Sequence, residues 1–165
     1  MAITTILLWI KKIVRGVKGD KTMKPHPNPM PEGIQGDFPE DNIRQWGCHF
    51  LSLMKWCEVV HGEVFTIDRL LNIYNRAVEA NLMQPNTLVL DSVALVNNVL
   101  GRQEYRGQMR DLKERPPVYA VLVRLTRPQG GTHFVMDIEG KIWDTLDPQR
   151  PAASTWQFDS YRVFV

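Results

Sequence analysis

Both cysteines and two of the four histidines of this chain fall between Gln45 and Gly62. From Phe50 to Val60 apolar side chains recur at helical spacing, and Gly62 is a typical helix stop. Cys48 therefore lies at the N-terminus of a predicted helix, where free backbone N–H groups and the helix dipole stabilise a thiolate. A cysteine in this position is a candidate nucleophile.

The second cysteine, Cys57, lies on the apolar face of the same predicted helix and is expected to be a small buried hydrophobe. Cys57 and His61 are four residues apart and face one way, so a zinc site completed by Cys48 and His49 is an alternative. The spacing matches none of the usual zinc-ligand pairs. We therefore expect no metal and no cofactor, and we expect His49 to point away from the candidate site.

A histidine and a carboxylate are predicted to meet on a hairpin near the C-terminus. Residues 132–138 and 141–144 form two predicted strands joined by a two-residue turn. A turn of that length places Asp144 opposite Val135, so His133 lies on the same face as Asp144 and diagonal to it. Diagonal neighbours are within side-chain reach, which makes this carboxylate a candidate to orient the imidazole.

The other predicted elements read as scaffold. They are helices over 67–82 and 91–100, a central strand covered on both faces over 118–125, and an edge strand over 160–165. Residues 104–115 are polar and charged, and the sequence predicts no more than a short strand or helix there.

This order of motifs resembles the papain-like cysteine peptidase superfamily. The motifs are Gln-x-Gly-Cys entering a helix, Gly-Thr-His-Phe-Val-Met on a strand and Lys-Ile-Trp-Asp after a glycine turn, within about residues 41–148. Among its branches the chain is most similar to the compact bacterial one related to the leader peptidases of bacteriocin exporters, which suggests a bacterial or phage origin. The resemblance implies an α+β fold in which an N-terminal helical half, with the nucleophile at a helix N-terminus, packs on a C-terminal antiparallel sheet.

The resemblance also implies a role for each motif residue. Cys48 would be the nucleophile that attacks an acyl carbon and forms a thioester, with His133 as its proton acceptor. Asp144 would hold the His133 ring in the tautomer that can accept the proton of Cys48. Gln45 would donate to the oxyanion together with the Cys48 backbone N–H.

Two of these positions stay open. The oxyanion glutamine of papain-like enzymes usually lies six residues before the cysteine, and that position is Asn42 in this chain. The Asp-Pro pair of the family points to Asp147 as the partner of the histidine, whereas the hairpin register favours Asp144.

The implied activity is that of a cysteine hydrolase, a peptidase or amidase, that cleaves a peptide or a peptidoglycan-like amide. The alternative is a non-catalytic protein on the same scaffold that binds a partner through its cleft or its basic N-terminal helix. The reactivity of Cys48 distinguishes the two.

Charge and cysteine content restrict the partners and the compartment. Residues 1–24 carry six Lys or Arg and one Asp or Glu, while the remaining residues carry fourteen Lys or Arg and seventeen Asp or Glu. The mildly acidic body argues against nucleic-acid binding. Two cysteines are too few for a disulfide framework, which indicates a reducing, cytoplasmic setting.

The predicted organisation has three parts: a basic amphipathic helix over 1–20, a proline-rich arm over 21–40 and the papain-like domain over 41–165. Within the first part, residues 6–18 combine an apolar stripe with a basic face. Such a helix either packs on the protein's own body or docks on a membrane surface or another protein.

Overall fold

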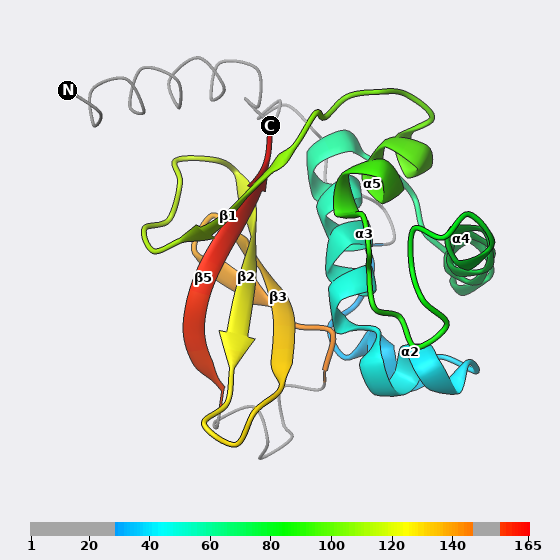
Figure 1. Cartoon of the computed structure of the whole chain (residues 1–165), viewed down its shortest axis with the longest axis horizontal. Helices are drawn as coiled ribbons and strands as arrows, with labels where there is room; N and C mark the ends of the chain where they lie inside the picture. Colours follow the sequence, from blue (N-terminus) through cyan, green and yellow to red (C-terminus); the bar gives the residue numbers. More distant parts are fainter. Residues whose placement is uncertain (1–28, 147–155) are drawn as a thin grey trace.

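The computed structural model describes residues 29–146 and 156–165. Within them the chain forms an α+β fold with four α-helices and a five-stranded antiparallel sheet, and the helices gather on one face of the sheet (Figure 1). The expected helix over 1–20, the first part of the arm and Asp147 lie outside the described residues. No helix among the described residues is both long and apolar enough to cross a membrane.

The helical layer is built around α3 (Cys48–His61), which packs on the sheet. Its apolar side chains, including the fully buried Phe50 and Leu53, form the main core. Gly62 ends the helix in the left-handed conformation, with φ 71°. The predicted helix and its stop are confirmed, and Cys48 is its first residue.

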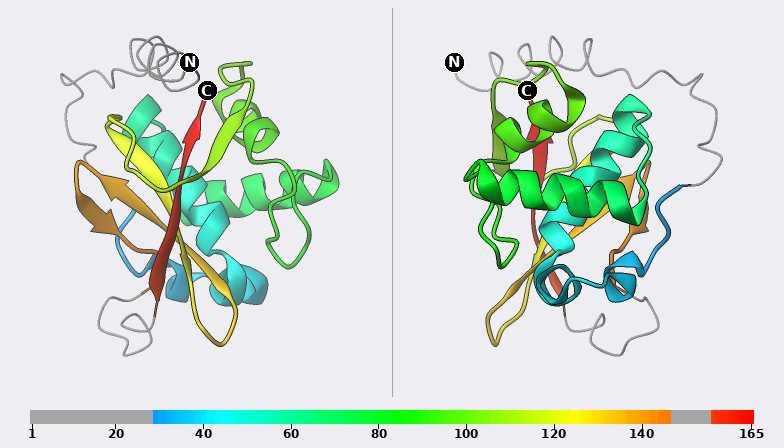
Figure 2. Two further views of the ribbon diagram at one scale, coloured as in Figure 1. Left: turned by 60° about the vertical axis from the view of Figure 1, so that its left-hand side comes forward. Right: turned by 90° about the vertical axis from the view of Figure 1, so that its right-hand side faces the viewer.

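Two further helices flank α3, as predicted. They are α4 (Ile67–Glu79) and α5 (Ser92–Leu100), which begin at the N-caps Thr66 and Asp91. The Thr66 side chain accepts a hydrogen bond from a backbone N–H of α4, and Asp91 does the same for α5. Figure 2 shows that α4 lies on the side of α3 that faces away from the sheet.

The described part of the proline-rich arm is integrated into the domain. It contains the 3₁₀ helix η1 (Ile34–Asp37), and Met30, Ile34 and Phe38 are buried in the main core. The expected boundary near residue 41 therefore does not match the packing, because the core begins at Met30. The sequence pattern missed this because prolines and glycines exclude regular structure but not burial.

Buried polar groups fix Met30 in place. Its backbone N–H donates to Glu58 Oε1 at 2.9 Å, and its carbonyl accepts from Lys55 Nζ and from Trp143 Nε1, both at 3.1 Å. The Lys55 and Glu58 side chains also form a buried ion pair with 2.7 Å between Nζ and Oε2. The start of the described chain is thereby tied to α3 and to the sheet.

The sheet has the strand order β1-β5-β2-β3-β4, with every pair antiparallel. The strands are β1 (Gln108–Leu112), β2 (Ala120–Thr126), β3 (Thr132–Ile138), β4 (Lys141–Trp143) and β5 (Gln157–Phe164). The middle strand, β2, is buried on both faces over Ala120–Val123, as predicted. The prediction of an edge strand over 160–165 is wrong, because β5 pairs with both β1 and β2.

The hairpin register matches the prediction. Asp137 pairs with Ile142, and Ile138 pairs with Lys141. The turn residues Glu139 and Gly140 have φ of 51° and 85°, the left-handed values that a tight two-residue hairpin requires.

Arg115 braces this hairpin through a largely buried ion pair. Its Nε lies 2.8 Å from Asp137 Oδ2, and its guanidinium also donates to the carbonyls of Pro116, Val118 and Tyr119. Asp137 Oδ1 accepts the Gly140 N–H at 2.7 Å. The segment that enters β2 is therefore fixed to the turn after β3.

Arg115→Ala should lower the free energy of unfolding by roughly 3 kcal/mol, because it leaves a buried carboxylate without its charged partner. Urea unfolding followed by circular dichroism measures the change. The matched control is Arg102→Ala, which removes the exposed ion pair between Arg102 and Glu104 and should cost far less. Equal losses in the two variants would show that Arg115 does not brace the hairpin.

Candidate active site

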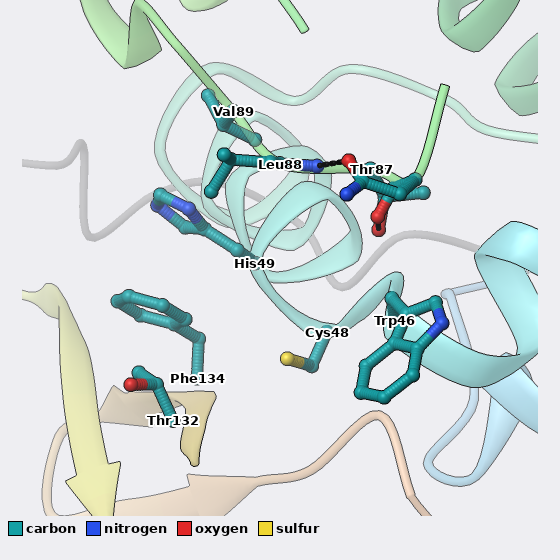
Figure 3. Close-up of a pocket in the computed structure, with 9 residues that line it drawn as sticks. Trp46, Cys48, His49, Thr87, Leu88, Val89, Thr132 and Phe134 are labelled. Atoms are coloured by element: carbon teal, nitrogen blue, oxygen red, sulfur yellow. Dashed lines mark hydrogen bonds between the residues drawn. The ribbon is translucent and has the colours of Figure 1, made fainter. Parts of the chain in front are cut away.

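Cys48 is held at the start of α3 by a tight junction with the preceding helix, α2 (Asp41–Trp46). Only Gly47 separates the two helices. The Cys48 sulfur projects between Trp46 on one side and Phe134 on the other (Figure 3). Cys48 is the first residue of α3, so its backbone N–H belongs to the first turn, whose N–H groups have no acceptor within that helix. The N-terminus of a helix favours an anion that forms beside the sulfur.

The hairpin brings His133 and Asp144 together as the register predicted. His133 Nε2 lies 2.7 Å from Asp144 Oδ1, and the two side chains are only 3% and 19% exposed. An ionised carboxylate only accepts hydrogen bonds, so Nε2 carries the proton of this bond. The other ring nitrogen, Nδ1, then remains to accept a proton from Cys48.

The surroundings of His133 favour its protonated form. Burial alone would lower the pKa of the ring, but the hydrogen bond to Asp144, followed by the interaction with Cys48, outweighs burial and raises the pKa to about 9. Within the described chain, no hydrogen bond of strict geometry joins the thiol to His133, yet the thiol is close enough to contribute to this shift. His133 is therefore protonated near neutral pH, next to the Cys48 thiol.

The arm holds the backbone around Asp144. The Gly33 N–H donates to the Asp144 carbonyl at 3.1 Å, and the Gln35 N–H donates to the Thr145 carbonyl at 3.0 Å. The side chains of Gln35 and Thr145 also share a hydrogen bond of 2.7 Å. Asp144 Oδ1 in addition accepts the N–H of Leu146 at 2.9 Å, which fixes the orientation of the carboxylate.

Trp156 covers the His133 ring, and our sequence analysis did not identify it. The two ring centroids are 5.3 Å apart with 32° between the planes. The Arg127 guanidinium carbon in turn lies 3.8 Å from the centroid of a Trp156 ring. Because Trp156 precedes β5, which pairs with β2 far back in the chain, no local signal connects it with His133. Its position shields the bond between His133 and Asp144 from water.

A cavity of about 360 Å³ opens beside Cys48. It is lined by side chains from α2, α3, β3 and the loop before α5 (Figure 3): Trp46, Cys48, His49, Asn86, Thr87, Leu88, Val89, Thr132 and Phe134. Trp46 and Leu88 at its rim are 63% and 54% exposed, which is unusual for large apolar side chains. The cavity is mostly apolar and suits an uncharged apolar group.

The expectation that His49 points away from the site is wrong, because its side chain lines this cavity. The His49 ring stacks on Phe134 with centroids 3.9 Å apart. Burial, with smaller effects from Arg162 and Arg110, lowers the pKa of His49 to about 3. His49 is therefore uncharged near neutral pH and adds shape, not charge, to the cavity wall.

The two oxyanion candidates are not brought into the cavity. Gln45 is exposed on α2 and does not line the cavity. Asn42 lies at the start of the same helix, where its side chain donates to Glu40 Oε1 at 3.1 Å. Of the expected donors, the backbone N–H of Cys48 remains beside the sulfur, at the start of α3.

The zinc alternative is not supported by the arrangement of its residues. Cys57 is fully buried in the core, and burial raises its pKa. His61 Nε2 lies 2.7 Å from the hydroxyl of Tyr105. In residues 29–146 and 156–165, no three His, Cys, Asp or Glu side chains are grouped so that they could hold a metal ion.

The chain matches the model of a protein family. The family is described as "Protein of unknown function, DUF261", and the match covers residues 35–165, which include both Cys48 and His133. No curated protein and no solved structure is significantly similar to the chain.

Proposed function

The chain belongs to the DUF261 family, and we propose that it is a cysteine hydrolase that cleaves a peptide or a related amide. The observation that carries this proposal is the convergence of Cys48, His133 and Asp144 beside an open cavity. These residues come from α3, β3 and the end of β4. A thiol, a base and an orienting carboxylate in this order are the groups that acyl transfer through a thioester requires.

In the proposed reaction, His133 Nδ1 takes the proton of the Cys48 thiol. The thiolate attacks the carbonyl carbon of the substrate, the carbon–nitrogen bond breaks, and the protonated His133 gives its proton to the leaving amine. Water then attacks the thioester, with His133 as the base, so the acid leaves and the Cys48 thiol is restored. Asp144 keeps Nε2 protonated throughout and so orients the ring.

The proposed oxyanion site begins with the Cys48 N–H. That group lies at the N-terminus of α3, where the helix dipole favours negative charge. Gln45 remains our proposed second donor, because its exposed side chain is not held by another group in the described chain. Asn42 is the weaker candidate, since Glu40 already accepts its side-chain amide.

The finer features of the proposal follow the resemblance to papain-like peptidases. The nucleophile lies in the helical half, the base lies on the antiparallel sheet, and the site lies between them. The apolar character of the cavity supports a peptide substrate with an uncharged apolar residue beside the cleaved bond. Trp46 and Leu88 would contact that residue at the rim.

The proposal predicts that iodoacetamide alkylates Cys48 well below pH 8, where an ordinary thiol with a pKa of about 8.5 is almost entirely protonated. In His133→Ala the rate near pH 6.5 should fall on the order of a hundredfold, since about one ordinary thiol in a hundred is ionised there. Mass spectrometry of Cys48 and Cys57 over a range of pH measures both rates. Cys57 is the internal control, because it is buried in the core and should not react in the folded protein.

The opposite result is equally clear. If Cys48 reacts only as fast as an ordinary thiol, or reacts at the same rate in His133→Ala, it is not activated. The non-catalytic binding protein would then be the better description of this chain.

A further inference from the structure

Two arginines lie on the same face of the sheet as Phe134, which forms one wall of the cavity. On the sheet, Arg124 of β2 is the direct partner of Phe134 of β3. Arg162 of β5 is the direct partner of Leu122, two residues before Arg124 on β2. Direct partners and residues two apart share one face of a sheet, so these side chains point the same way. They point to the face that carries the helices.

Arg162 lies directly against the cavity wall. Its guanidinium carbon is 4.9 Å from the centroid of the Phe134 ring, whose neighbour in the cavity wall is His49. In the part of the chain that the structure describes, Arg162 Nε is buried without a hydrogen-bond partner, and no carboxylate forms an ion pair with Arg162. Arg162 as a whole is half-buried, so the rest of its guanidinium group can still be reached by a ligand that supplies the missing carboxylate.

The positive charge here is only partly compensated. Arg124 has an ion pair of 3.3 Å with Asp159, and that carboxylate also lies 3.6 Å from Lys113 Nζ. Burial, followed by the charges of Arg110 and Arg124, lowers the pKa of Arg162, while Asp111 and Asp159 oppose this more weakly. We call Arg110, Arg124 and Arg162 the arginine cluster.

The geometry points to the arginine cluster as the binding site for a carboxylate of the substrate, next to the apolar residue that occupies the cavity beside Cys48. This inference rests on the proposed hydrolase function and assigns its substrate class: an acidic peptide. Guanidinium groups bind carboxylates through two parallel hydrogen bonds, and no carboxylate of the described chain forms an ion pair with Arg162. No charged side chain lines the cavity itself, so selection for charge would come from the cluster.

The test measures how well short peptides protect Cys48 from iodoacetamide in the full-length protein. Three acetylated tetrapeptides are used, each with a leucine. The first has Glu beside the leucine and an amidated C-terminus, and the second has Gln in place of Glu and the same amidated C-terminus. The third has the sequence of the Gln peptide but a free C-terminal carboxylate. The first and third distinguish a side-chain carboxylate from a terminal one. Protection is expressed for each protein variant relative to its own rate without peptide.

In the wild type, at least one carboxylate peptide should protect at about a tenfold lower concentration than the neutral Gln peptide, as a charge-assisted hydrogen bond implies. In Arg162→Gln this preference should disappear. Arg110→Gln changes an exposed position and should reduce the preference even if Arg162→Gln does not fold. Arg76→Gln, on α4, is the control and should keep the preference.

Equal protection by all three peptides would overturn the inference, and so would a preference that survives in Arg162→Gln and Arg110→Gln. Failure of every peptide to protect, while alkylation of Cys48 still depends on His133, would also overturn it and leave the proposed hydrolase standing. Loss of the dependence on His133 would instead contradict the proposed function itself.

Discussion

In Asp144→Asn the alkylation of Cys48 near pH 6.5 is expected to slow roughly 10- to 100-fold, which corresponds to the loss of one hydrogen bond to a charged group. The Asp144 carboxylate accepts the His133 Nε2 proton at 2.7 Å, and this bond overcomes the effect of burial and holds the pKa of His133 at about 9. Asparagine has the same shape and accepts the same bond without the negative charge. Burial then lowers the pKa of His133, and the imidazolium that stabilises the thiolate is lost.

The direction of the pH dependence follows from this shift. In the wild type His133 is protonated below about pH 9, so the imidazolium is present to stabilise the thiolate across the neutral range. In Asp144→Asn the ring should lose its proton at lower pH, so alkylation should become fast only as the pH approaches the pKa of an ordinary thiol, about 8.5. An NMR titration of the His133 ring and the alkylation profile measure the two changes independently.

A purely structural role for Asp144 predicts a different result. A damaged site would react more slowly at every pH, with the titration of the His133 ring unchanged. Asp68→Asn provides the matched control, because Asp68 is exposed on α4, away from the hairpin. It should change neither the alkylation rate nor the titration of His133.

The approach of His133 to Asp144 could be predicted because it depends on local chain geometry. A two-residue turn at Glu139 and Gly140 fixes the pairing of the strands it joins, and a strand alternates its faces with a period of two. The position of Cys48 was predictable for a similar reason, since the helix that follows it has a regular apolar spacing and ends at Gly62.

The features that the sequence did not predict depend on contacts between distant segments. Trp156 reaches His133 because β5 lies between β1 and β2 in the sheet. The local sequence around Trp156 does not predict this strand order. Met30 is buried because Lys55 and Glu58, on α3, bind its backbone. Propensity and periodicity describe neighbours along the chain, so they do not detect such pairings.

The arm shows how such a distant contact bears on the site. The arm over residues 21–40 was expected to be separate from the papain-like domain, yet Gly33 and Gln35 bind the backbone of Asp144 and Thr145. The carboxylate that orients His133 is therefore positioned from both ends of the domain: by the hairpin register on one side and by the arm on the other. A strand end alone would leave Asp144 less constrained.

Gly47→Ala is expected to destabilise the protein by about 2–3 kcal/mol, the range for forcing an extra methyl group into a packed site, and to disturb Cys48. The backbone of Gly47 has φ −72° and ψ 1°, which any residue can adopt, so conformation is not the reason. Space is the reason, because an added Cβ would lie 2.4 Å from the Ile43 carbonyl oxygen and 2.8 Å from Ile43 Cγ2. The junction between α2 and α3 has to open to admit the methyl group.

Opening this junction weakens two backbone hydrogen bonds, from the Gly47 N–H to the Ile43 carbonyl at 2.8 Å and from the Leu51 N–H to the Gly47 carbonyl at 2.9 Å. The first bond caps the end of α2 and the second fixes the first turn of α3. The Cys48 thiol should therefore move relative to His133, and its alkylation below pH 8 should slow together with the loss of stability. Urea unfolding and the alkylation rate measure the two effects. Gly36→Ala is the matched control, because nothing lies within 4 Å of a Cβ added there. Equal stability and equal alkylation rates in the two variants would show that the junction tolerates a side chain and does not set the position of the nucleophile.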